Sequence, residues 1–246
     1  MPDLTKDLEV FQLKTNHYGF SGTRVEQLDA SEYTLVTLVF DRSGSTSGFR
    51  DEMREAVDKI IDACKKSPRA DNLMLRVCEF SDTLHERHGF VKLSSINKSD
   101  YDDLMQGGGG LTALYDAAEN SVSATESYAM TLTQNDYGVN GIVFVMTDGM
   151  DNRSKLTPHE VKKTFAHAVS SEAMESLVSV LIGINLEPDA DMYLNKFRTE
   201  SGFTQYINIG DATPQKLAKL ADFVSKSISS QSQSLGSGGP SQPIQF

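Results

Sequence analysis

Apolar residues in this chain occur either in short continuous runs or at helical spacing, and the two patterns alternate. Runs rich in β-branched and aromatic residues are typical of strands buried on both faces. They predict strands at 33–40, 72–80, 90–93, 142–146, 177–184 and 204–209. Helical spacing predicts helices at 49–64, after the glycine run 107–110, after Thr157–Pro158, at 192–197 and at 213–230.

The order of these elements is β-α-β-β-α-β-α-β-α-β-α. Alternation of apolar strands with helices predicts an α/β fold with a doubly wound, Rossmann-like and mostly parallel central sheet, covered by helices on both faces.

Composition divides the chain into three segments. Residues 1–31 have mixed polarity and form an N-terminal extension, in which Arg24–Leu28 is a candidate added strand. Residues 32–230 carry the alternating pattern and form one domain. Residues 231–246 are mainly Ser, Gln, Gly and Pro, too poor in apolar groups to pack, and we expect a flexible tail.

Oxygen-bearing side chains follow three of the predicted elements. Asp41, Ser43 and Ser45 are alternate residues directly after the first strand. Thr112 follows the glycine run, and Asp148 follows the strand 142–146. Ligands of open parallel sheets bind at the carboxyl ends of the strands, so these side chains are expected to converge.

Two carboxylates and three hydroxyls, without nitrogen or sulfur ligands, suit a hard divalent cation. Mg²⁺ is the first choice, with Mn²⁺ or Ca²⁺ possible. The two carboxylates balance the charge of the ion, and the neutral hydroxyls leave it able to accept an external anion. The pattern therefore predicts a site that captures a ligand rather than a closed structural cage.

The three motifs together resemble the von Willebrand factor type A (VWA) domain and its metal-ion-dependent adhesion site (MIDAS). They are Asp41-x-Ser43-x-Ser45, Thr112 within Gly-Leu-Thr-Ala-Leu-Tyr-Asp-Ala, and Asp148 within Thr-Asp-Gly-Met-Asp-Asn. The resemblance covers about residues 32–230 and matches all five metal-site positions. It departs from the family in a glycine run of four residues, separated from Thr112 by Leu111.

The resemblance implies a non-enzymatic protein that binds another protein, with an Asp or Glu of the partner completing the metal shell. It implies that Ser43 and Ser45 coordinate directly, that Thr112 joins or leaves the shell, and that Asp41 and Asp148 act directly or through water. The chain looks like an intracellular bacterial or phage-type member, and an adaptor in a multiprotein assembly is the expected role.

Charge and apolar content argue against two classes of partner, nucleic acids and membranes. The net charge of −11 and the lack of any Lys/Arg run longer than a pair argue against nucleic acid. No window approaches the roughly 20 apolar residues needed to cross a bilayer, and the first ten residues lack a secretory pattern. We expect a cytoplasmic protein without a membrane partner; the pattern does not predict an oligomeric state.

Two other functions fit parts of the pattern. A hydrolase could use Ser43 or a metal-bound water, but it would need a general base, and the carboxylates at the site are already required by the metal. A structural component of a phage or multiprotein particle could carry the same residues as a vestigial metal site. Its assembly would then be insensitive to removal of the metal.

Overall fold

The structure, a computed structural model, describes residues 8–13, 18–238 and 243–246. Its strands are β1 (Leu8–Phe11), β2 (Phe20–Thr23), β3 (Glu32–Asp41), β4 (Leu73–Phe80), β5 (Leu84–Lys92), β6 (Gly138–Thr147), β7 (Ser176–Gly183) and β8 (Gln205–Asn208). Its α-helices are α1 (Arg50–Lys65), α2 (Leu114–Thr133), α3 (Pro158–Ser170), α4 (Pro188–Ser201) and α5 (Pro214–Ser237). Short 3-10 turns lie at Val25–Gln27, Gly44–Gly48, Ala70–Asn72, Leu93–Ser95 and Lys98–Tyr101.

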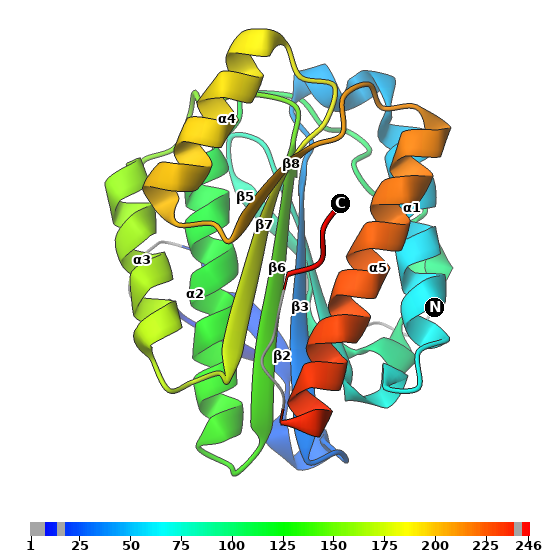
Figure 1. Ribbon diagram of the computed structural model, residues 1–246, viewed down its shortest axis with the longest axis vertical. Helices are drawn as coiled ribbons and strands as arrows, with labels where there is room; N and C mark the ends of the chain where they lie inside the picture. The colour runs from blue at the N-terminus through cyan, green and yellow to red at the C-terminus, as the bar shows by residue number, and fades with distance from the viewer. Residues whose placement is uncertain (1–7, 14–17, 239–242) are drawn as a thin grey trace.

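The described strands form an eight-stranded sheet in the order β1-β2-β5-β4-β3-β6-β7-β8. The pairs from β4 through β3, β6 and β7 to β8 are parallel, whereas β4 pairs with β5 and β1 with β2 in antiparallel fashion. Helices α1 and α5 cover one face, and α2, α3 and α4 cover the other (Figure 1). The predicted α/β fold class is confirmed.

Period-two alternation along β3 explains why both faces are apolar. Val36, Leu38 and Phe40 pack with α1 and α5, whereas Val39 packs with α2 and α3 on the opposite face. All residues of β3 from Tyr33 onward are buried. The strand that ends at the candidate site therefore lies in the centre of the sheet, where packing on both sides fixes its position.

The N-terminal extension contributes two strands, but not at the residues expected. Arg24–Leu28 contains a 3-10 turn, and the added strands are β1 and β2. Strand β2 joins β5 by a close approach at Gly89, where a Cβ atom would lie 1.8 Å from the Ser21 carbonyl oxygen. Residues 1–7 and 14–17 of this extension lie outside the described residues.

The predicted tail, 231–246, differs from the structure, because α5 continues to Ser237. Buried polar partners explain the difference: the Gln231 side-chain amide donates to the Gly141 carbonyl at 3.1 Å, and Arg69 donates to the Ser232 hydroxyl at 3.0 Å. Residues 239–242 lie outside the described residues. The Phe246 ring packs against Phe223, with centroids 5.5 Å apart.

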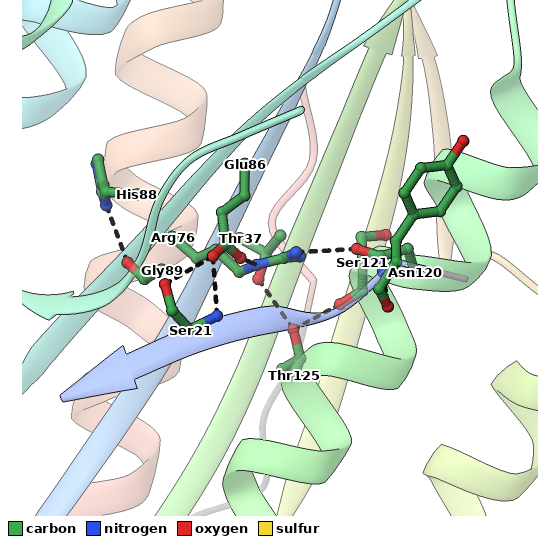
Figure 2. Close-up of polar contacts among 10 residues, drawn as sticks. Ser21, Thr37, Arg76, Glu86, His88, Gly89, Asn120, Ser121 and Thr125 are labelled. Carbon is green, nitrogen blue, oxygen red and sulfur yellow. Dashed lines mark hydrogen bonds and ion pairs between the residues drawn. The ribbon is translucent and has the colours of Figure 1, made fainter. Parts of the chain in front are cut away.

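An ion pair between the buried Arg76 and the partly buried Glu86 joins β2 to the main sheet (Figure 2). Arg76 of β4 is fully buried and donates to Glu86 of β5 at 2.6 Å and to Asn120 of α2 at 2.9 Å. Glu86 also accepts hydrogen bonds from the backbone N–H and the hydroxyl of Ser21 on β2, at 2.8 and 2.7 Å. One charged pair thus links β2, β4, β5 and α2.

Within the described residues, every helix is too short or too polar to span a lipid bilayer.

Replacing Arg76 by Met should lower the free energy of unfolding by about 3–5 kcal/mol, because the Glu86 carboxylate would keep its charge without the cation. Urea-induced unfolding measures this loss. Replacing both residues, Arg76→Met with Glu86→Leu, should cost less than Arg76→Met alone.

The control is Lys226→Ala, which removes an exposed ion pair to Asp222 on α5. Such pairs contribute about 0–1 kcal/mol. An Arg76→Met loss no larger than that of Lys226→Ala would contradict the role assigned to the buried pair.

Candidate metal centre

Strands β3 and β6 bring the first two predicted ligands together. They are parallel neighbours with Phe40 opposite Met146, so both chains leave the sheet at the same edge. Asp41 is the last residue of β3, and Asp148 directly follows β6. The hydroxyl of Thr147 donates to Asp41 Oδ2 at 2.6 Å and thereby fixes one carboxylate oxygen.

The loop after β3 folds back over Asp41. The Ser43 backbone N–H donates to Asp41 Oδ1 at 2.8 Å, and a 3-10 turn then begins at Gly44. The Ser43 and Ser45 hydroxyls lie 3.1 Å apart, and Ser45 donates to Asp148 Oδ1 at 2.9 Å. A continuous chain of hydrogen bonds therefore joins four of the five predicted ligands.

Thr112 reaches this region through its backbone. Its N–H donates to the Asn152 side-chain oxygen at 2.7 Å, and its carbonyl accepts from the Asn152 N–H at 3.0 Å. Thr112 is buried, with 5% of its surface exposed. The structure thus holds Thr112 beside the loop that carries Asp148. That all five residues bind a metal stays a prediction.

The glycine run allows its loop to approach the loop after β3. A Cβ atom on Gly108 would lie 2.2 Å from the Arg42 carbonyl oxygen, so a larger residue would force the two loops apart. Gly107 and Gly110 have φ angles of 65° and 86°, in the left-handed region that glycine adopts without strain. The run therefore has a conformational role at this edge.

The electrostatics of the site favour a cation. Burial raises the pKa of Asp41, which is 3% exposed. Burial, followed by the negative charge of Asp41, raises the pKa of Asp148 to about 6. Among the described residues, neither carboxylate has an ion pair with Lys, Arg or His. A divalent cation would remove both the repulsion and the desolvation cost.

The donor set fits a hard cation with open positions. Within the described part of the chain, no group of three or more His, Cys, Asp or Glu side chains is arranged to hold a metal. A cage built from such side chains is therefore absent from those residues. The two carboxylates and neighbouring hydroxyls instead match the few-ligand sites in which Mg²⁺ keeps several waters.

Two residues outside the predicted set of five position the predicted ligands. Thr147 orients Asp41, and Asn152 holds Thr112. Both residues lie close to Asp148 in the sequence, which indicates that they belong to the same edge of the sheet. Thr147 is the last residue of β6, and Asn152 lies in the turn after Asp148. Asp116, in the first turn of α2, accepts from the backbone N–H groups of Lys155 and Leu156.

Comparisons with protein-family models and with curated proteins find no match. Solved structures do match. The PilB minor pilin from Streptococcus sanguinis aligns with a TM-score of 0.56 and 14% identity, over 89% of this chain and 66% of that chain. A von Willebrand factor type A structure from Catenulispora acidiphila aligns with a TM-score of 0.56 and 16% identity, over 85% of this chain and 44% of the other.

A third similar structure is proximal thread matrix protein 1 from the mussel byssus, described with a zinc-occupied MIDAS motif. It aligns with a TM-score of 0.55 and 20% identity, over 81% of this chain and 46% of that chain. The chain thus spans less than two thirds of each of these proteins. At these identities the likeness shows the fold alone, and that fold is the Rossmann-like fold of VWA domains.

Asp148→Asn should stabilise the metal-free protein at pH 7 by about 1–2 kcal/mol, allowing for partial exposure of the carboxylate. The pKa of Asp148 is about 6 in the folded protein and 3.8 as its ordinary value. Between pH 3.8 and 6, Asp148 is therefore protonated in the folded protein and ionised in the unfolded chain. Its stability therefore falls as pH rises from about 3.8 to 6, and the ionised group destabilises it above that range.

Urea unfolding in EDTA at several pH values measures the effect. The difference between the variant and the unmodified protein should shrink toward acid pH. Addition of Mg²⁺ should stabilise only the unmodified protein. A variant that is less stable than the unmodified protein at pH 7 in EDTA would contradict the unbalanced-charge account.

Proposed function

We propose that this protein is a metal-dependent protein-binding module. A divalent cation, with Mg²⁺ as first choice and Mn²⁺ or Ca²⁺ as alternatives, is held by Asp41, Ser43, Ser45, Thr112 and Asp148. When bound, the cation supplies an electrophilic position for an Asp or Glu carboxylate of a partner protein. The observation that carries the proposal is the pair formed by the buried Asp41 and the half-buried Asp148, neither of which has an ion pair with a cationic side chain among the described residues.

The protein's own residues define how a partner would be received. Thr147 and the Ser43 N–H hold the Asp41 carboxylate in one orientation, so this ligand needs no rearrangement. The hydroxyls of Ser43 and Ser45 lie beside Asp148 and add neutral oxygen donors. Since Ser45 is exposed, a partner could reach this side of the site.

The similar structures support a role in protein interaction. They include a minor pilin, a pilus adhesin from Lactobacillus rhamnosus GG and a byssus matrix protein, whose names describe adhesive or structural proteins. We carry over to this chain only the general idea of a protein-interaction module. An adaptor role in a multiprotein assembly and a cytoplasmic location remain proposals, and cell fractionation with an antibody against the chain tests the location.

A structural component with a vestigial metal site is the second candidate, favoured by the likeness to a byssus matrix protein. Its assembly would be the same in Mg²⁺ and in EDTA. A hydrolase receives less support, because the Ser43 hydroxyl contacts Ser45, and the carboxylate next in that chain of hydrogen bonds is a proposed metal ligand.

Isothermal titration with Mg²⁺ tests the proposed metal site. The unmodified protein should bind one equivalent, whereas Asp41→Ala and Asp148→Ala should show no binding heat, because each removes half of the charge that balances the cation. Thr147→Val should weaken Mg²⁺ binding about 10–100-fold, because it removes only the hydroxyl that orients Asp41.

Asp222→Ala is the matched control, since it removes an exposed carboxylate from α5 far along the chain from the site. Unchanged Mg²⁺ binding in both Asp41→Ala and Asp148→Ala would contradict the proposed metal site. Affinity purification from the native host then identifies partners that depend on the metal. The baits are the unmodified protein and a variant that carries both Asp41→Ala and Asp148→Ala.

A further inference from the structure

Two large apolar side chains are exposed on the loops that carry Thr112 and Asp148. Leu111 directly precedes Thr112 and is 46% exposed; Met150 lies two residues after Asp148 and is 43% exposed. The exposed large apolar residues among those described are Val10, Leu111, Met130, Met150, Val169 and Met192. Two of these six therefore flank the candidate metal centre, although binding of a metal ion alone requires no apolar surface there.

Hydrogen bonds hold the Leu111 loop in place. The Leu111 N–H donates to Asp82 Oδ1 at 3.0 Å, and the two bonds between Thr112 and Asn152 fix the next residue. The side chain is therefore presented to solvent by a backbone anchored on both sides. Because the backbone is held in this way, it loses little conformational freedom when a partner covers Leu111.

The Met150 loop is fixed at its beginning. The Gly149 N–H donates to the Thr147 hydroxyl at 3.2 Å, and this hydroxyl also holds Asp41. Because Asn152 lies two residues after Met150 and pairs with Thr112, the loops bearing Leu111 and Met150 are joined side by side. Leu111 and Met150 are therefore carried by two joined loops, which we call the rim of the candidate metal centre.

The rim also carries positive charge. Arg153 follows Asn152, its side chain is 58% exposed, and its Nε lies 3.9 Å from Asp82 Oδ1. Because Asp82 offsets the charge of Arg153, a bound cation, rather than Arg153, would supply the attraction for an acidic partner. Leu111 and Met150 favour a partner that has an apolar group beside its carboxylate, which a simple anion lacks.

We propose that Leu111 and Met150 select partner segments in which an Asp or Glu stands beside a large apolar residue. This inference rests on the proposed function and specifies its partner. The acidic group would bind at the metal while the apolar neighbour covers Leu111 and Met150. Exclusion of water around the carboxylate would strengthen the charged contact, as the rim of near-neutral contacts does around an interface hot spot.

Selection from a library of displayed cyclic peptides tests the inference. Each peptide carries a fixed Asp at its centre with randomised residues on both sides, and selection is performed on the full chain in Mg²⁺. The selected peptides should be enriched in Leu, Ile, Met or Phe next to the Asp, and EDTA should release them. Their affinities are then measured by isothermal titration with synthesised peptides.

Leu111→Ser and Met150→Ser should each weaken the selected peptides about tenfold, an effect typical of interface hot spots. Both variants should keep the Mg²⁺ affinity of the unmodified protein, which shows that the metal centre is intact. Val169→Ser is the matched control, because Val169 is 70% exposed and lies near the end of α3. It should leave peptide affinity unchanged.

Two failures are distinguishable. Metal-dependent peptides without apolar enrichment, or with affinities unaffected by Leu111→Ser and Met150→Ser, would overturn this inference and leave the proposed function standing. A selection that yields no peptide released by EDTA would overturn both.

Discussion

Two like charges held close together at one edge of a sheet are the constraint on which this structure depends. Asp41 is the last residue of β3 and Asp148 directly follows β6, and the parallel register of these strands brings both residues to the same edge of the sheet. Burial of Asp148, followed by the negative charge of Asp41, raises the pKa of Asp148 to about 6. Such an arrangement costs stability unless a cation is present, and the surrounding hydroxyls and tight loops are compatible with one.

The central strands of the sheet hold Asp41 and Asp148 in place. Strand β3 is buried on both faces by helices from both layers, so the loop at its end starts from a fixed point. The loop residues are then fixed by their own hydrogen bonds, among them Thr147 to Asp41 and Asn152 to Thr112. Precise ligand placement on loops is possible because the strands that support them do not move independently.

The central fold could be predicted because its signals are local. Val36, Leu38 and Phe40 alternate with Val39 along one strand, and such alternation within an apolar run requires cover on both faces. Asp41 and Asp148 could be paired in advance because parallel strands end at a common edge. The prediction that five side chains converge needed no more than this rule and their positions in the chain, and the structure joins four of them by hydrogen bonds.

The remaining features depend on contacts between distant residues. Composition predicted a flexible tail from Gln231 onward, yet Gln231 donates to the Gly141 carbonyl inside the protein, and no local pattern indicates that partner. Likewise β2 depends on the close approach of Ser21 to Gly89, 68 positions apart in numbering. The hydrogen bond from Thr112 to Asn152 likewise depends on how two separate loops meet, which the sequence motif does not indicate.

Anomalous diffraction from crystals grown with Mn²⁺ tests the central claim most directly. The account predicts one anomalous peak at the edge between β3 and β6, about 2.0–2.6 Å from oxygen atoms of Ser43 and Ser45 or from waters held by Asp41 and Asp148. A map at saturating Mn²⁺ with no peak at this edge, or with peaks only elsewhere on the surface, would contradict it.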